Sequence, residues 1–215
     1  MNITKKEMFN GCLIASIAHA IMTNMYPELS YEQSWDGVNY SIHNTSGLRG
    51  TITFESDFCV GAIRNEKSDI CVYGDSIRKH MMCFPNNVVH KAYEETLQYL
   101  LMERNGYIMP CVTSIFWAND ITVYFEKKCI DVIKRDFILF EKILLQKEDA
   151  IDAWRNYYDM DSNSIKLLNE LYQIKAKDFN SRIILSEEQK KLIPGICIND
   201  ECIESLEELK IFLRE

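Results

Sequence analysis

The sequence predicts an α+β protein, in which an antiparallel β-meander with packed helices precedes a helical C-terminal region. Apolar and polar residues alternate in steps of two over several short stretches between residues 38 and 73, as in half-buried strands. Apolar residues recur in steps of three and four near the N-terminus and again after residue 128, as on one face of a helix. With 47% apolar and 26% charged residues, the chain has an ordinary globular composition.

The first half of the chain is expected to begin with a helix over residues 4–24. Thr4 and Glu7 form a capping box, and Pro27 lies beyond the expected end. Four short strands with polar links then predict an antiparallel meander. These strands are expected at residues 38–42, 51–55, 58–64 and 70–73.

Two helices and a second hairpin are expected next. Asn105-Gly106 is interpreted as the end of the second helix, and Pro110 marks the following strand as an edge strand or one that begins late. The helices are expected at residues 75–83 and 86–103, and the hairpin strands at 107–117 and 121–125.

The strongest single pattern predicts one continuous helix from Lys128 to Tyr158, ~45 Å long at 1.5 Å per residue. Its apolar seam is interrupted once, at Lys147. The seam consists of Ile130, Ile133, Phe137, Phe140, Leu144, Ile151, Trp154 and Tyr158. A shorter helix over residues 165–177 is expected to pair with it as a helical hairpin. Ser186 and Gln189 form a capping box for a short helix, and a last helix is expected over 203–214.

A change in composition near Glu126 predicts an α+β region over residues 1–125 and a helical region over 126–215. The partner helix covers under half of the long one, so apolar surface around Phe137, Leu145 and Trp154 is expected to contact another protein chain or a second copy.

Charge and cysteine usage narrow the function classes. Lys and Arg number 24 against 32 Asp and Glu, so the net charge is −8. No basic run exceeds two residues, which disfavours direct nucleic-acid binding and attraction to anionic membranes. The eight cysteines lie mostly in apolar stretches and form no CxxC pair, which predicts free thiols in a cytoplasmic protein without a membrane span.

A loop at one end of the predicted sheet concentrates residue types that are common in binding hot spots. Trp35, Asp36, Tyr40 and Arg49 are its candidate interaction residues. The alternative is a hairpin whose glycines permit positive φ angles and whose aromatic rings seal the sheet edge.

One short motif points to a metal-dependent nuclease. Asp120 precedes the strand 121–125, and Glu126-Lys127-Lys128 follows it. A metal-dependent phosphodiesterase needs a carboxylate to hold a divalent cation and a nearby lysine to stabilise charge. The arrangement resembles the PD-(D/E)xK nuclease pattern. It departs from that pattern because Asp120 lies at a hairpin tip instead of on a preceding strand.

Cys12 is a second catalytic candidate, as the nucleophile of a cysteine hydrolase with His19 and His43 following it. However, it lies two turns inside the first helix, where the dipole field is spent, and on the apolar face, so a core position is the alternative. The four histidines form no metal-binding motif, and no nucleotide loop occurs, so neither a metal nor a cofactor is expected.

The sequence therefore predicts a non-catalytic protein-interaction protein. Two roles fit: an accessory subunit of a multi-protein complex, such as a bacterial-type defence complex, or an immunity or antitoxin-type inhibitor of a basic partner. The alternative is an enzyme, either a nuclease using Asp120, Glu126 and Lys128 or a hydrolase using Cys12.

Overall fold

The computed structural model describes residues 3–126 and 130–214. Contacts within the chain group it into two compact units. Unit 1 comprises Met1–Lys6 and Val38–Glu141, and unit 2 comprises Glu7–Gly37 and Lys142–Glu215. Each unit is therefore built from two segments of the chain, which differs from the consecutive division at residue 125 that the composition indicates.

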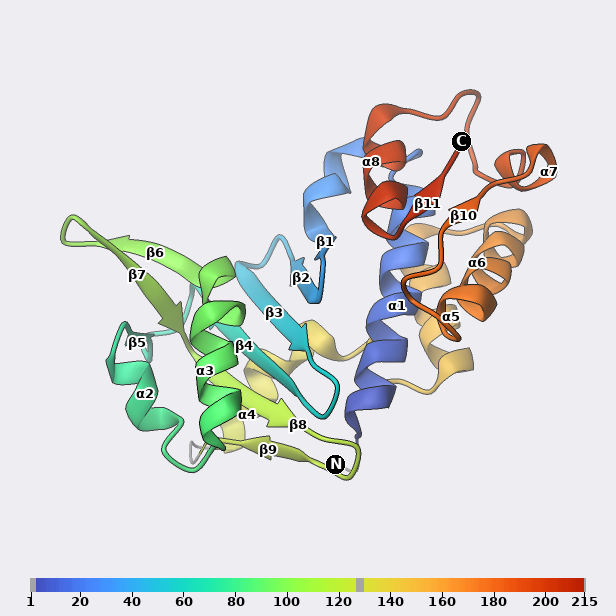
Figure 1. The fold of residues 1–215 in the computed structure, drawn as a ribbon. Helices are drawn as coiled ribbons and strands as arrows, with labels where there is room; N and C mark the ends of the chain where they lie inside the picture. The colour runs from blue at the N-terminus through green and yellow to red at the C-terminus, as the bar shows by residue number, and fades with distance from the viewer. Residues whose placement is uncertain (1–2, 127–129, 215) are drawn as a thin grey trace. The chain divides into compact units, whose positions relative to one another are not determined.

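Unit 1 contains an antiparallel sheet with the strand order β2-β3-β4-β8-β9 (Figure 1). A smaller sheet has the order β5-β7-β6. The strands of the larger sheet are β2 (Asn39–His43), β3 (Leu48–Phe54), β4 (Cys59–Asn65), β8 (Ser114–Ala118) and β9 (Val123–Phe125), and those of the smaller are β5 (Val72–Tyr73), β6 (Leu101–Arg104) and β7 (Tyr107–Val112).

Helices cover both faces of the larger sheet in unit 1, as Figure 1 shows. On one face, Val60, Ala62 and Ile115 join the apolar core beneath the helices that follow β5. On the other, a Cβ at Gly61 would collide with the Phe116 ring, which itself packs on Phe137 and Phe140. The helices of this unit are α2 (Ser76–His80), α3 (Asn86–Glu94), η2 (Thr96–Leu100), α4 (Ile130–Phe137) and η3 (Ile138–Phe140).

Unit 2 is built around α1 (Lys5–Met22), which is buried almost all round from Met8 onward. At Gly11 a Cβ would collide with the carbonyl oxygen of Ile143, so glycine permits the close approach of a second segment. The other elements are η1 (Pro27–Glu32), β1 (Gln33–Asp36), α5 (Lys147–Tyr158), α6 (Ser162–Lys175), β10 (Ile183–Ile184), α7 (Glu187–Lys190), α8 (Asp200–Glu208) and β11 (Ile211–Phe212).

The α+β fold class, the N-terminal helix and the first three strands are confirmed. In the helical region, α6 is capped by Asp161, and α7 has the expected capping box of Ser186 and Gln189. Among the described residues, no helix combines the length and the apolarity needed to cross a membrane.

The prediction of one continuous helix over 128–158 is wrong. Residues 127–129 lie outside the described residues, α4 and η3 end at Phe140, and α5 begins at Lys147 after a Gln146 in extended conformation. The two halves of the seam belong to different cores: Phe137 packs with Phe116 in unit 1, and Trp154 stacks on Tyr158 in unit 2. Tertiary packing therefore overrides the helical period.

Four further expectations are corrected. The strand β5 pairs with β7 in the smaller sheet. The place beside β4, expected for the strand 70–73, is taken by β8. The expected helix 86–103 ends at Glu94 and gives way to η2 and β6. The expected strand 107–117 is divided at Thr113 into β7 and β8, and the last helix runs from Asp200 to Glu208, capped by Asn199.

Candidate functional site

An exposed apolar feature of unit 1 is the hairpin of β6 and β7, called the arm below. Asn105 and Gly106 join the two strands with φ angles of 54° and 80°, as a two-residue type I′ turn requires. Arg104 faces Tyr107 across the turn, which fixes the register. Figure 1 shows the arm extending beyond the helices of its unit.

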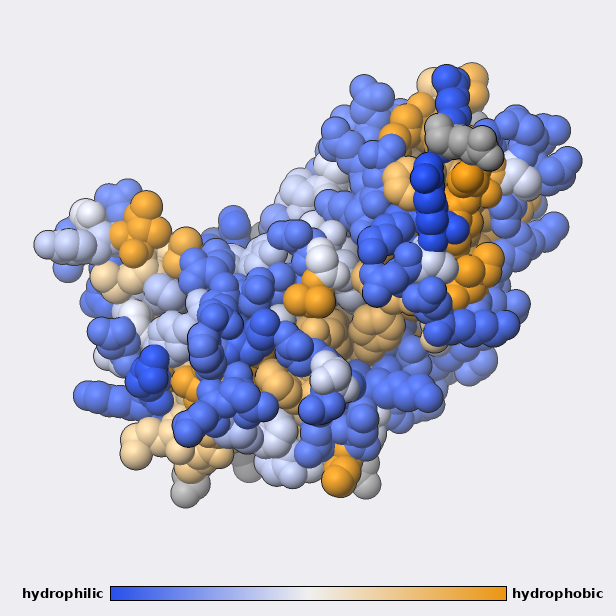
Figure 2. All heavy atoms as spheres, viewed as in Figure 1, coloured by the Kyte–Doolittle hydropathy of each residue, from blue (hydrophilic) through white to orange (hydrophobic). Residues whose placement is uncertain are grey.

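Large apolar side chains of the arm are open to solvent. Figure 2 shows hydrophobic residues gathered on it. Their exposed fractions are 40% for Leu101, 43% for Met102, 71% for Tyr107 and 74% for Ile108. A folded chain exposes single apolar residues routinely, but several on one short ribbon mark an interaction surface.

The strand pairing assigns these side chains to two faces of the arm. Residues directly opposite each other share a face, so Ile108 lies with Glu103, and Tyr107 with Arg104. The Arg104 guanidinium lies 4.0 Å from the ring centre of Tyr73, which holds the second face against β5. In the part of the chain that the structure describes, β6 has a strand on one side only. The Leu101 carbonyl oxygen accepts from Arg64 Nη1 at 3.0 Å, and the outer edge beyond Leu101 offers backbone groups for pairing.

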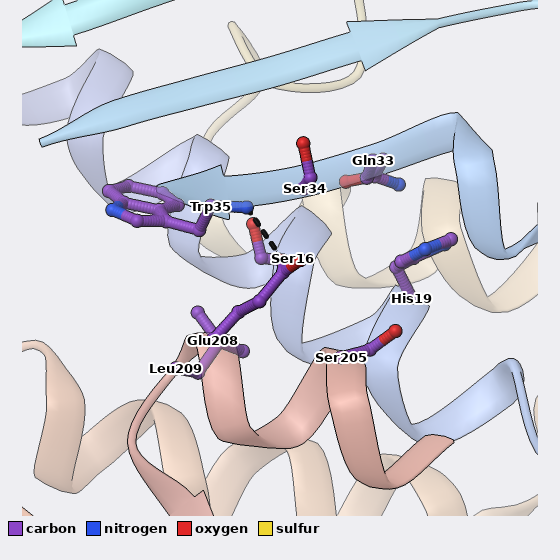
Figure 3. Close-up of a pocket in the computed structure, with 8 residues that line it drawn as sticks. All are labelled: Ser16, His19, Gln33, Ser34, Trp35, Ser205, Glu208 and Leu209. Atoms are coloured by element: carbon purple, nitrogen blue, oxygen red, sulfur yellow. Dashed lines mark hydrogen bonds between the residues drawn. The ribbon is translucent and has the colours of Figure 1, made fainter. Parts of the chain in front are cut away.

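Unit 2 contains a small polar cavity, shown in Figure 3. The Glu208 carboxylate accepts the backbone N–H of Trp35 at 2.7 Å, and burial raises the pKa of that carboxyl group. The cavity volume of about 10 Å³ is that of one water molecule, so it can hold a bridging water but no substrate. Its lining consists of Ser16, His19, Gln33, Ser34, Trp35, Ser205, Glu208 and Leu209.

A buried hydrogen-bond network adjoins this cavity. His19, 2% exposed, has its Nδ1 2.9 Å from Tyr158 Oη and its Nε2 3.2 Å from the Ser30 carbonyl oxygen. Gln33 Nε2 donates to the same phenol oxygen at 3.3 Å, and burial raises the pKa of Tyr158. The partners of His19 are fixed, so this histidine serves packing and orientation.

The predicted nuclease residues Asp120 and Glu126 differ in their exposure to solvent. Asp120 is exposed at the turn between β8 and β9. Glu126 is 5% exposed and its Oε2 lies 2.8 Å from His80 Nδ1. Lys128 lies outside the described residues. Among the described residues, no group of three or more His, Cys, Asp and Glu side chains is placed to hold a metal ion.

Cys12 has no exposed surface and lies in the core of unit 2, as the core interpretation expects. The hydroxyl of Ser16 donates to its carbonyl oxygen at 2.8 Å, one helical turn away. The cysteines that the structure describes are free thiols, and burial raises the pKa of both Cys59 and Cys202 to about 12. Such thiols stay protonated and unreactive.

The predicted interaction residues divide into buried and exposed ones. Asp36 and Arg49 are exposed, and Arg49 Nε lies 3.3 Å from Glu66 Oε1. Leu145 is 42% exposed and lines a cavity of about 100 Å³ with Tyr172 and Lys147. The aromatic candidates Trp35, Tyr40, Phe137 and Trp154 are all at most 7% exposed.

Sequence reasoning missed the arm, although a signal for it is present. Asn-Gly between two stretches that can form strands is the strongest short-range indication of a hairpin. The interpretation of Asn105-Gly106 as the end of a helix over 86–103 is wrong, because the residues on both sides of this dipeptide form strands.

The net charge is carried by one unit. Unit 1 spans 13 basic and 13 acidic residues, and unit 2 spans 11 basic and 19 acidic residues, so unit 2 accounts for the whole of −8. Electrostatic attraction of cations is therefore a property of unit 2.

Comparisons of the chain with protein families, with curated proteins and with solved structures found no match.

Proposed function

We propose that this protein is a non-catalytic interaction protein that docks on a basic protein partner, and that the arm is its docking element. The observation that carries the proposal is the exposure of Tyr107 and Ile108 at 71% and 74% on a ribbon with an open strand edge. An incoming strand can pair with such an edge while the apolar side chains fill pockets beside it.

Charge supports the basic character of the partner. The surplus of eight acidic residues on unit 2 attracts a positively charged protein and accelerates its association. The described cysteines form no disulfide with one another, which supports residence in a reducing compartment such as the cytoplasm. Both roles expected from the sequence, accessory subunit and immunity-type inhibitor, use surfaces of this kind.

The test compares the wild-type protein with a double variant, Tyr107→Ser with Ile108→Ser. Partners are cross-linked in the source cell, identified by mass spectrometry and re-tested as purified proteins. The matched control is Ile121→Ser, because Ile121 is 78% exposed and lies between β8 and β9, away from the arm in the sequence. We expect the double variant to lose the partner and the control to retain it.

Two outcomes overturn the proposal. One is an interaction with the purified partner that the double variant and Ile121→Ser retain equally. The other is a wild-type protein that captures nothing and stays monomeric in light scattering. With a partner in hand, its activity at equimolar protein separates the two roles: an inhibitor abolishes that activity, and an accessory subunit preserves or raises it.

A further inference from the structure

A lysine of unit 2 lies in a corner formed by two aromatic rings. Lys142 Nζ is 5.5 Å from the ring centre of Trp154 and 4.9 Å from that of Tyr157. Both rings are on α5, three residues apart, and their planes meet at 86°. Both distances lie within the ~6 Å over which a ring face attracts a cation.

A buried carboxylate lies behind one wall of this corner. Glu32 is 4% exposed, and the Tyr157 hydroxyl donates to its two oxygens at 2.9 and 2.8 Å. Burial raises the pKa of Glu32, while the Tyr157 hydrogen bond and the charge of Lys142 oppose that rise. Because a buried negative charge is costly without a nearby positive one, the corner favours a cation.

The other wall contains a donor without an acceptor. Trp154 is 4% exposed, and its Nε1–H is buried with no hydrogen-bond partner among the described residues. Buried indole N–H groups normally have an acceptor. A carbonyl group of a ligand would supply the missing acceptor, and the cation of the same ligand would replace Lys142.

Two other lysines of the unit show what distinguishes this place. Lys147 lies 5.2 Å from the single ring of Tyr172, and Lys175 lies 5.8 Å from the single ring of Phe179. For neither lysine do the described contacts include a second aromatic ring or a buried carboxylate. Lys142 also lies in the turn before α5, so it can leave the corner without breaking a helix.

We propose that Glu32, Trp154 and Tyr157 form a binding site for an alkylammonium group, which Lys142 occupies until a lysine side chain of a protein partner displaces it. We name these three residues the cation corner. The inference that a partner's lysine supplies the ammonium group rests on the proposed function. The affinity of the corner for an alkylammonium ion does not. The acidic surplus of unit 2 favours both.

The first test uses Lys142→Met, which keeps an unbranched apolar stem and removes the charge. Tetramethylammonium chloride is titrated against sodium chloride at equal ionic strength, and the indole N–H signal of Trp154 is followed by NMR. We expect a saturable shift in Lys142→Met, and binding about tenfold weaker in the wild type, a ratio within reach of one cation–π contact. The matched control, Lys147→Met, should respond as the wild type does.

Two additions distinguish the residues and the ligand source. Glu32→Gln in the Lys142→Met background should weaken the shift, because it removes the buried charge. A capped lysine, with a capped norleucine as its control, should bind Lys142→Met as well if a partner's lysine is the ligand. If tetramethylammonium binds and the capped lysine does not, the corner takes free quaternary ammonium ions and the displacement by a partner's lysine is overturned.

A measurement on the wild-type protein guards against a variant that fails to fold. Tetramethylammonium should raise the rate at which Lys142 is acylated, as read by mass spectrometry, and leave the rate at Lys147 unchanged. No change at Lys142, or equal responses of Lys142→Met and Lys147→Met, would overturn the cation corner. Because these measurements use small cations and the isolated chain, a negative result in them is separate from any failure of the arm to dock.

Discussion

The two units differ in net charge, although both bury hydrogen-bonded polar side chains. In unit 1, Thr53 Oγ1 lies 2.7 Å from Thr96 Oγ1, and Ser114 donates to the buried Asp136 at 2.7 Å. Unit 2 buries the hydroxyl groups of Ser16 and Thr23, and also the Tyr158 phenol with its bond to His19. Unit 1 is electrically neutral and unit 2 carries −8.

The contrast separates two kinds of surface on one chain. The neutral unit exposes an apolar ribbon, whereas the acidic unit holds Lys142 between two aromatic rings with a buried carboxylate behind one of them. Apolar burial supplies most of the affinity at protein interfaces, and charge supplies steering and selectivity. The four predictions that follow test whether the units are distinct in this way, from the largest expected effect to the smallest.

The largest effect is expected in the sheet core of unit 1. Phe116 is fully buried against Phe125, Phe137 and Phe140, so Phe116→Ala should lower the free energy of unfolding by about 3–5 kcal/mol. Denaturant titration is followed by the NMR indole signals of Trp117 in unit 1 and Trp154 in unit 2. If both signals are lost together in this variant, the units unfold as one and the comparison fails.

A smaller effect is expected for Tyr158→Phe in unit 2. The substitution leaves the buried His19 Nδ1 without its partner at 2.9 Å, which should cost about 1–3 kcal/mol of stability. Tyr172→Phe is the control, because Tyr172 is 9% exposed and its hydroxyl has no hydrogen-bond partner in the described part of the chain. Equal losses in the two variants would contradict a specific role of the network.

The pH dependence of unit 2 should reveal Lys175. Its Nζ donates to the carbonyl oxygens of Phe179 and Ser181 at 3.1 and 2.5 Å, and burial, with Lys210 nearby, lowers its pKa to about 8 against the opposing charge of Asp178. Between pH 8 and an unfolded value of 10.5 the unfolded chain binds more protons, so this lysine makes folding more favourable as the pH rises.

The check is the free energy of unfolding of the wild type minus that of Lys175→Met, measured from pH 7 to pH 10. That difference should increase with pH. The buried tyrosines and cysteines act in the opposite direction, because their raised pKa values disfavour the native state above the unfolded values, but they act equally in both proteins. A flat or falling difference would show that Lys175 is not held in this way.

The smallest effect on stability is expected at the arm. Because both side chains are largely exposed, Tyr107→Ser with Ile108→Ser should change the free energy of unfolding by no more than about 0.5 kcal/mol. Thermal and denaturant unfolding measure this directly. A loss as large as that of Tyr158→Phe would show that these side chains belong to the core of unit 1 instead of serving a partner.

Local rules predicted what depends on neighbours in sequence. The capping box of Ser186 and Gln189 and the positions of β2, β3 and β4 are confirmed, because each depends on residues close together in sequence. The half-buried character expected of the strands is not seen in β3 and β4, which are buried almost throughout. The helical spacing of apolar residues after Lys128 predicts one helix because α4 and α5 each have an apolar face. Only three-dimensional packing assigns the two faces to different units.

Two sequence features near the break could have corrected the long helix. Lys147 interrupts the seam, and Glu148 and Asp149 follow it as the acidic first turn of a new helix. Within the cation corner, Trp154 is one of the interaction residues that the sequence predicts, but the hydrogen bond of Tyr157 to Glu32 joins positions 125 residues apart. No local rule predicts such a meeting.

The tight turn at Asn105 and Gly106 has a consequence for how the arm behaves on contact. Its two left-handed residues match the natural twist of the strands, so the ribbon already has its final shape before anything touches it. Little conformational entropy then remains to be lost on association. A hairpin with a fixed conformation can therefore bind a partner through a small contact area. A flexible loop of the same composition would bind the same partner more weakly.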